Sequence, residues 1–161
     1  NIGHGNIEIA EAVKNQISEM EYCSPFTEST EPAAELASVL SEISPGDLNS
    51  VFFTTDGSTA NDTAIRFVMF YNNVLGRPKK KHIITRDRAY HGSTYLTASL
   101  NGKDRDKNKF DFEKKFIHHL SSPLPYRRNK NQTIDEFCDD MYIKFGESDN
   151  LNIFALLKIN Y

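Results

Sequence analysis

Cysteine is scarce in this chain of 161 residues, which contains only Cys23 and Cys138. The two cysteines form no CxxC pair or other metal-binding spacing, and isolated thiols of this kind suit a reducing compartment. Long hydrophobic runs are also lacking, since none approaches the about 20 residues that a membrane span needs. The N-terminus does not show a charged start followed by an apolar stretch, so no secretory signal is visible. These absences predict a cytoplasmic protein with no metal site and no membrane partner.

An excess of charge of one sign is lacking as well. The chain has 19 basic and 22 acidic residues, a net charge of −3. A dedicated nucleic-acid binder would need a concentrated basic face, so the composition argues against a nucleic-acid partner. Hydrophobic residues make up 39% and charged residues 25%, the composition of a soluble globular protein of about one domain.

The apolar pattern predicts helices that alternate with short strands. Helices are predicted over residues 6–20, 32–43, 59–75 and 91–100, and after a capping box formed by Thr133 and Glu136. Buried strands are predicted at 51–54, 82–85, 116–117 and 153–157. Such alternation favours an α/β fold with a mainly parallel sheet and flanking helices. We expect a helical layer over 1–45 and the sheet portion over 46–161, both in one domain.

A turn between the first predicted strand and the following helix is the most informative local feature. It reads Asp56-Gly57-Ser58. A helix N-terminus exposes unpaired backbone N–H groups and partial positive charge, which suits a phosphate, and Gly57 permits close approach. Many helices begin with such residues merely as a cap, so this reading stays open on local sequence alone. The nucleotide motifs GxGxxG and GxxxxGK[ST] are not present.

A family resemblance favours the phosphate reading. The stretches VFFTTDGSTANDTAIRF and GRPKKKHIITRDRAYHGSTYLTASLNGK resemble class III aminotransferases that depend on pyridoxal 5'-phosphate (PLP), and NIGHGNIEIAEAV is similar to the same family. The Ser-Thr-Ala sequence at 58–60 and the Tyr-Asn-Asn sequence at 71–73 look most like those of omega-transaminases. The resemblance implies part of the large domain of a fold-type I PLP enzyme, which acts on amine and keto-acid substrates as a homodimer.

The resemblance also implies roles for individual residues. Gly57 and Ser58 are expected to hold the PLP phosphate, and Tyr90 to stack on the pyridine ring, although a buried structural tyrosine is the alternative. His91 completes the Tyr-His-Gly motif and is expected at the cofactor. Phe26 falls where family members place an aromatic wall of the substrate pocket. No residue of the chain is assigned a catalytic role.

Two departures from the family pattern stand out. Asp56 takes a position where relatives usually have Ser or Gly, and a carboxylate beside a phosphate is electrostatically unfavourable, although a helix N-terminus favours it. The lysine that forms the Schiff base comes, in this family, from beyond Tyr161, and no lysine of this chain matches that motif. We therefore expect a portion of a transaminase that is inactive alone; the alternative is a non-catalytic truncated homologue that acts through interactions.

Overall fold

The computed structural model describes residues 2–121, 124, 126, 129–139 and 153–156. The chain divides into two compact units, Asn1–Phe52 and Phe53–Tyr161. The expected grouping of a helical layer over 1–45 and a sheet portion over 46–161 into one domain stays a prediction.

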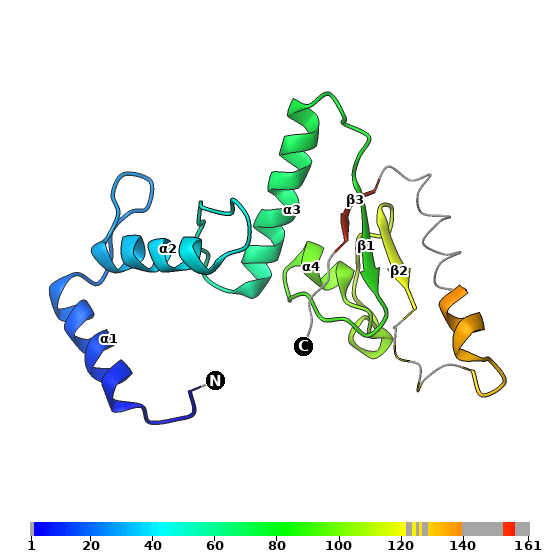
Figure 1. The fold of residues 1–161 in the computed structure, drawn as a ribbon, viewed down its shortest axis with the longest axis horizontal. Coiled ribbons are helices and arrows are strands. Elements are labelled where there is room, and N and C mark those ends of the chain that lie inside the picture. The colour runs from blue at the N-terminus through cyan, green and yellow to red at the C-terminus, as the bar shows by residue number, and fades with distance from the viewer. Residues whose placement is uncertain (1, 122–123, 125, 127–128, 140–152, 157–161) are drawn as a thin grey trace. The chain divides into compact units, whose positions relative to one another are not determined.

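The first unit contains two helices, α1 (Ile7–Glu19) and α2 (Glu31–Ile43), shown in blue and cyan in Figure 1. Both begin at a side chain that accepts a hydrogen bond from the first turn: Asn6 Oδ1 from the N–H of Ile9 at 3.1 Å, and Thr30 Oγ1 from the N–H of Ala33 at 3.4 Å. The predicted helices at these positions are confirmed. Neither helix has a buried residue, so the buried core of the described chain lies in the second unit.

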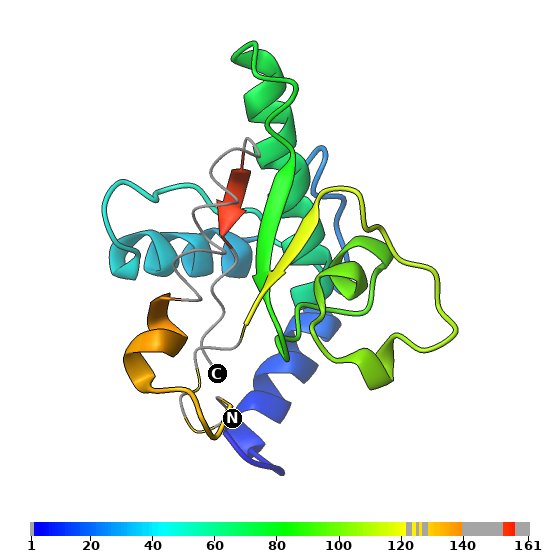
Figure 2. The ribbon, with the colours of Figure 1, turned by 90° about the vertical axis from the view of Figure 1, so that its right-hand side faces the viewer.

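The second unit is built around three parallel strands, β1 (His82–Arg86), β2 (Ile117–Leu120) and β3 (Ile153–Leu156). Their order is β2-β1-β3, with β1 in the centre (Figure 2). Two helices, α3 (Gly57–Val74) and α4 (Tyr95–Leu100), accompany the sheet, and α4 is followed by a 3₁₀ turn, η1 (Asp104–Asp106). The predicted α/β class with a parallel sheet is confirmed.

One face of this sheet packs against α3 and α4. Ile83 of β1 lies directly beside Ile117 of β2 in the register, and both belong to one buried cluster with Ile65 of α3 and Leu100 of α4. Burial of these aliphatic side chains is the main force that holds the helices to the sheet. The α3 helix ends at Val74, shortly before Gly76, whose φ of +70° suits glycine.

Two of the predicted elements are wrong. Residues 51–54 form no strand, and Phe52 and Phe53 are 66% and 47% exposed rather than buried. A short apolar run specifies a strand only if a neighbouring strand pairs with it, and the run alone does not reveal one. Of the helix predicted over 91–100, only α4 is helical; residues 91–94 form an irregular turn, which the site requires.

The capping box predicted for Thr133 and Glu136 is confirmed. The N–H of Thr133 donates to Glu136 Oε2 at 2.7 Å and the N–H of Glu136 donates to Thr133 Oγ1 at 3.2 Å. Helix follows over 134–139, and the rest of this predicted helix lies outside the described residues. Among the helices of the described part, none has both the length and the hydrophobicity needed to cross a membrane.

Two imidazoles meet across the start of the sheet. His82 Nδ1 and His118 Nε2 are 2.8 Å apart, a distance at which one nitrogen donates a proton to the other. Partial burial, and then the neighbouring His82 and His119, hold the pKa of His118 below its ordinary value of 6.5. The folded chain therefore resists protonation of His118, which the unfolded chain accepts readily.

We predict that His118 makes the stability of the chain depend on pH. The unfolded chain binds more protons than the folded chain just below about pH 6.5, so the free energy of unfolding should fall as the pH falls through that value. Urea unfolding at about pH 7.5 and about pH 5.5 should show a smaller loss of stability for His118→Gln than for the parent chain. The exposed His4 supplies the control, His4→Gln; equal losses in all three proteins would contradict the prediction.

Candidate functional site

The N-terminus of α3 forms the first part of the site. Gly57 is its first residue, and a Cβ added to Gly57 would meet no atom within 4 Å, so the turn is open to an approaching group. The N–H groups of Gly57, Ser58 and Thr59 belong to the first turn of the helix, which has no carbonyl partners for them within the helix. The turn thus has the shape and the polarity of an anion site.

The carboxylate of Asp56 already binds this turn. Asp56 Oδ1 accepts hydrogen bonds from the N–H of Ser58 at 2.7 Å and of Thr59 at 3.0 Å, and Asp56 Oδ2 accepts one from the Thr55 hydroxyl at 3.1 Å. In return the Thr59 hydroxyl accepts from the N–H of Asp56 at 3.2 Å, which completes a capping box. The bond from the Thr59 N–H contributes most to holding the pKa of Asp56 below its ordinary value, so Asp56 is an anion at neutral pH.

A turn from Tyr90 to Ser93 lies against the start of α3. The N–H of Ser93 donates to Ser58 Oγ at 3.1 Å, and the Ser93 hydroxyl lies 2.9 Å from the Tyr90 hydroxyl. Tyr90 is 43% exposed, so the alternative reading as a buried structural tyrosine does not describe it. The structure therefore brings together three of the predicted residues: Gly57, Ser58 and Tyr90.

Gly92 allows the turn to approach α3 this closely. Its φ of +144° is a backbone conformation that other residues rarely adopt. A Cβ at this position would lie 2.5 Å from Thr97 Oγ1 and 2.7 Å from Ser58 Oγ. A side chain here would therefore separate Ser93 from Ser58.

His91 lies beneath the turn instead of at its surface, with 3% of its area exposed. Its Nε2 is 2.8 Å from Thr85 Oγ1, and the Thr85 hydroxyl donates to the carbonyl of Leu100 at 3.0 Å. Because the hydroxyl proton is used in that bond, His91 Nε2 carries the proton that is donated to Thr85, as it does in one of the two neutral tautomers. Burial, followed by the charges of Arg86 and His119, lowers the pKa of His91 and favours this neutral form.

Two asparagines, which the sequence did not single out, fix the backbone of the turn. Asn101 accepts from the N–H of His91 at 2.6 Å and donates to the carbonyl of Gly92 at 2.9 Å. Asn61 of α3 donates to the carbonyl of His91 at 2.8 Å. These contacts join residues 9 to 30 positions apart, and no local pattern identifies them. The role predicted for His91 at the cofactor stays a prediction, whereas its contacts are those of a support for the turn.

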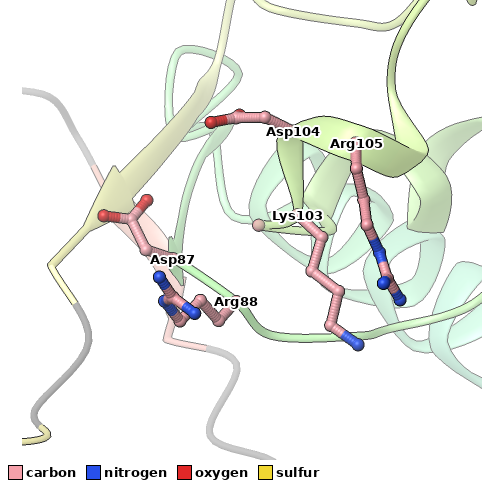
Figure 3. A pocket seen from close by; sticks show the side chains of 6 residues that line it. Asp87, Arg88, Lys103, Asp104 and Arg105 are labelled. Carbon is pink, nitrogen blue, oxygen red and sulfur yellow. The ribbon is translucent and has the colours of Figure 1, made fainter. Parts of the chain in front are cut away.

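A separate pocket of about 530 Å³ lies beyond the carboxyl end of β1. Figure 3 shows that its lining is almost entirely charged, with Lys103 and Arg105 extending to one side and the carboxylates of Asp87 and Asp104 to the other. Arg88 and Gly102 complete the lining, and the N–H of Arg88 donates to the carbonyl of Gly102 at 2.8 Å. This charged lining offers no flat apolar surface for a pyridine ring.

Phe26, predicted to be a wall of the substrate pocket, belongs to the first unit. It lies in a turn and is 96% exposed. Its role at the substrate stays a prediction.

Comparison with known proteins identifies the family. The sequence model of the family described as Aminotransferase class-III matches residues 1–157. The chain belongs to the class-III aminotransferases. This family depends on PLP. The resemblance drawn from the sequence motifs is therefore confirmed.

Curated class-III transaminases similar to this chain are much longer than it is. A diaminobutyrate–2-oxoglutarate transaminase of Halomonas elongata is 39% identical over 133 residues, which are 82% of this chain and 28% of that protein. A vanillin aminotransferase of Capsicum frutescens is 40% identical over 124 residues, 76% of this chain and 27% of that protein. The chain thus spans less than a third of the length of these relatives.

Solved transaminase structures share the fold. A transaminase with L-alanine superposes with a TM-score of 0.89 at 29% identity, covering 98% of this chain and 38% of that one. The omega transaminase of Pseudomonas jessenii in complex with PMP, pyridoxamine 5'-phosphate, superposes with a TM-score of 0.86 at 32% identity, covering 94% of this chain and 35% of that one. The described fold is that of a part of a PLP-dependent transaminase.

The site fits the phosphate of PLP in shape, but two of its backbone donors are occupied. The open space at Gly57 and the exposed ring of Tyr90 suit a flat phosphorylated cofactor. The N–H groups of Ser58 and Thr59, which would hold the phosphate, are bonded to the anionic Asp56 instead. A phosphate that used these two N–H groups would have to displace the Asp56 carboxylate.

We predict that Gly92→Ala destabilises the second unit, because the added Cβ would clash with Thr97 and Ser58 and the backbone angle is unfavourable for alanine. A loss of at least about 2 kcal/mol in the free energy of unfolding is expected. Gly57→Ala is the matched control, since a Cβ there has open space, and it should change stability by less than about 0.5 kcal/mol. Urea unfolding measures both; equal losses for the two variants would contradict the assigned role of Gly92.

Proposed function

We propose that this chain is the part of a class-III aminotransferase that holds the phosphate and one ring face of PLP. The intact enzyme would transfer an amino group from a primary amine or omega-amino acid to a keto acid such as pyruvate. Small-molecule amines and keto acids would be its partners, with a second copy of the chain in a homodimer. A cytoplasmic location belongs to the same proposal.

The observation that supports this proposal is the hydrogen bond between the N–H of Ser93 and Ser58 Oγ at 3.1 Å. It joins the α3 N-terminus to the turn that carries Tyr90, so a phosphate group and an aromatic ring could be held by neighbouring segments. Family membership over residues 1–157 supports the same assignment from the sequence.

The residues of this chain would bind and orient the cofactor. Gly57 and Ser58 would place the phosphate at the positive end of α3, and Tyr90 would fix the plane of the ring. PLP, when bound, supplies the electron sink that amino-group transfer needs. No lysine of this chain matches the family's lysine motif, so we propose that the chain has no catalytic residue of its own and is inactive alone.

The alternative function is a non-catalytic homologue that acts by association with another protein. Such a homologue would keep the fold but would not catalyse amino-group transfer. The exposure of the aromatic residues Phe67 and Phe70 of α3 favours this possibility, because exposed apolar surface is typical of protein interaction sites. The family match does not distinguish the two, so an experiment must.

The mass and the activity of the natural protein separate the two functions. Alanine formation from pyruvate and a primary amine, in a purified protein with a mass well above the 18.3 kDa of this chain, is expected for the transaminase. A mass near 18.3 kDa with no alanine formed would establish the non-catalytic alternative.

We predict that Ser58→Asp weakens cofactor binding by at least about tenfold, because it places a second carboxylate beside the phosphate. PMP is a suitable probe since its amine cannot condense with surface lysines, and calorimetry gives its dissociation constant. The exposed Asn108 supplies a control, Asn108→Asp, which adds the same charge away from the site. An unchanged affinity in Ser58→Asp would show that the phosphate binds elsewhere.

A further inference from the structure

Asp56 makes the bonds that an anionic ligand of this turn would make. Its carboxylate accepts from two successive backbone N–H groups, those of Ser58 and Thr59, and from the hydroxyl of Thr55. A phosphate held by the start of α3 would need the same donors. Each N–H has one proton to donate, so the carboxylate and a phosphate compete for it.

We infer that Asp56 is a tethered competitor for the phosphate site: PLP phosphate, or free phosphate, bonds to the N–H groups of Ser58 and Thr59 only when the Asp56 side chain has left them. The capping box and phosphate binding are then alternative states of one turn. This inference rests on the proposed function, because it takes the start of α3 to be the phosphate site.

The structure allows the side chain to leave without loss of the helix. Asp56 is exposed, so its carboxylate can rotate into solvent and remain hydrated. The N–H of Ala60 donates to the Asp56 carbonyl at 3.0 Å, a backbone bond that keeps the helix start when the side chain moves. Gly57 adds no atom that would block the movement.

Displacement of the carboxylate lowers the affinity for phosphate in two ways. The helix loses an N-cap, whose usual contribution to stability corresponds to roughly 2- to 30-fold in an equilibrium constant. The displaced carboxylate also stays close to a phosphate of the same sign, although solvent screens this repulsion. Removal of the carboxylate should therefore tighten binding by about tenfold.

Two substitutions separate the effect of the negative charge of Asp56 from the effect of its capping of α3. Asp56→Asn keeps an oxygen that can cap α3, and asparagine is as good an N-cap as aspartate, so this variant should fold. Asp56→Gly removes the competing side chain altogether. The exposed Asp111 supplies a matched control for net charge, Asp111→Asn.

The measurement is the dissociation constant of PMP by calorimetry, with pyridoxamine, which has no phosphate, as the second probe. PMP should bind about tenfold more tightly to Asp56→Gly than to the parent chain. Asp56→Asn should lie between them, and Asp111→Asn should match the parent. With pyridoxamine the four proteins should be equal, because the effect belongs to the phosphate.

Failure of the inference differs from failure of the proposed function. If all four proteins bind PMP with the same constant, Asp56 does not compete, and the cofactor assignment stands. If none binds PMP, the cofactor assignment is wrong and the inference falls with it. NMR provides a second readout: inorganic phosphate should shift the amide signals of Ser58 and Thr59 at lower concentration in Asp56→Gly than in the parent, and equal titrations would overturn the inference.

Discussion

The hydrogen bond from the N–H of Ser93 to Ser58 Oγ joins the two segments on which the candidate site depends. These residues are 35 positions apart, and neither segment forms a site without the other. A single neutral hydrogen bond contributes only about 1 kcal/mol to stability, so it cannot by itself hold an irregular turn in place. Other contacts must therefore help to hold the turn in place.

Buried and half-buried polar side chains provide that support. Asn101 and Asn61 bind the backbone of the turn, and His91 ties it to Thr85 of the central strand. A buried polar group is costly unless it is hydrogen-bonded, so these partners act as a set, and the loss of one leaves others unpaired. The central strand thus supports the site through the bond of Thr85 to His91, while Ile83, two residues earlier, packs in the hydrophobic core.

The sequence predicted what local patterns determine and missed what distant contacts determine. The α3 helix and β1 follow from apolar spacing and from the turn at Gly76, and the structure confirms them. The strand at 51–54 failed because an apolar run does not reveal its ladder partner. Residues 91–94 were wrongly predicted as helix. Their turn depends on hydrogen bonds to Asn101 and Asn61, and such long-range bonds produce no periodic pattern in the sequence. Gly57, Ser58 and Tyr90 came from family motifs, while the hydrogen bonds of Asp56 came only from the structure.

Asp56 gives α3 a stability that its packing supplies only in part. Of the large apolar residues of this helix, Ile65 is buried in the cluster, whereas Phe67, Phe70 and Val74 are more than half exposed in the described structure. A helix with so narrow a buried face depends more on its own ends, and an anionic N-cap is among the strongest local stabilisers. The full negative charge that makes aspartate effective in this role also makes it compete with a phosphate, which serine, being neutral, would do less. The residue at position 56 therefore sets a balance between the stability of α3 and its availability to a ligand.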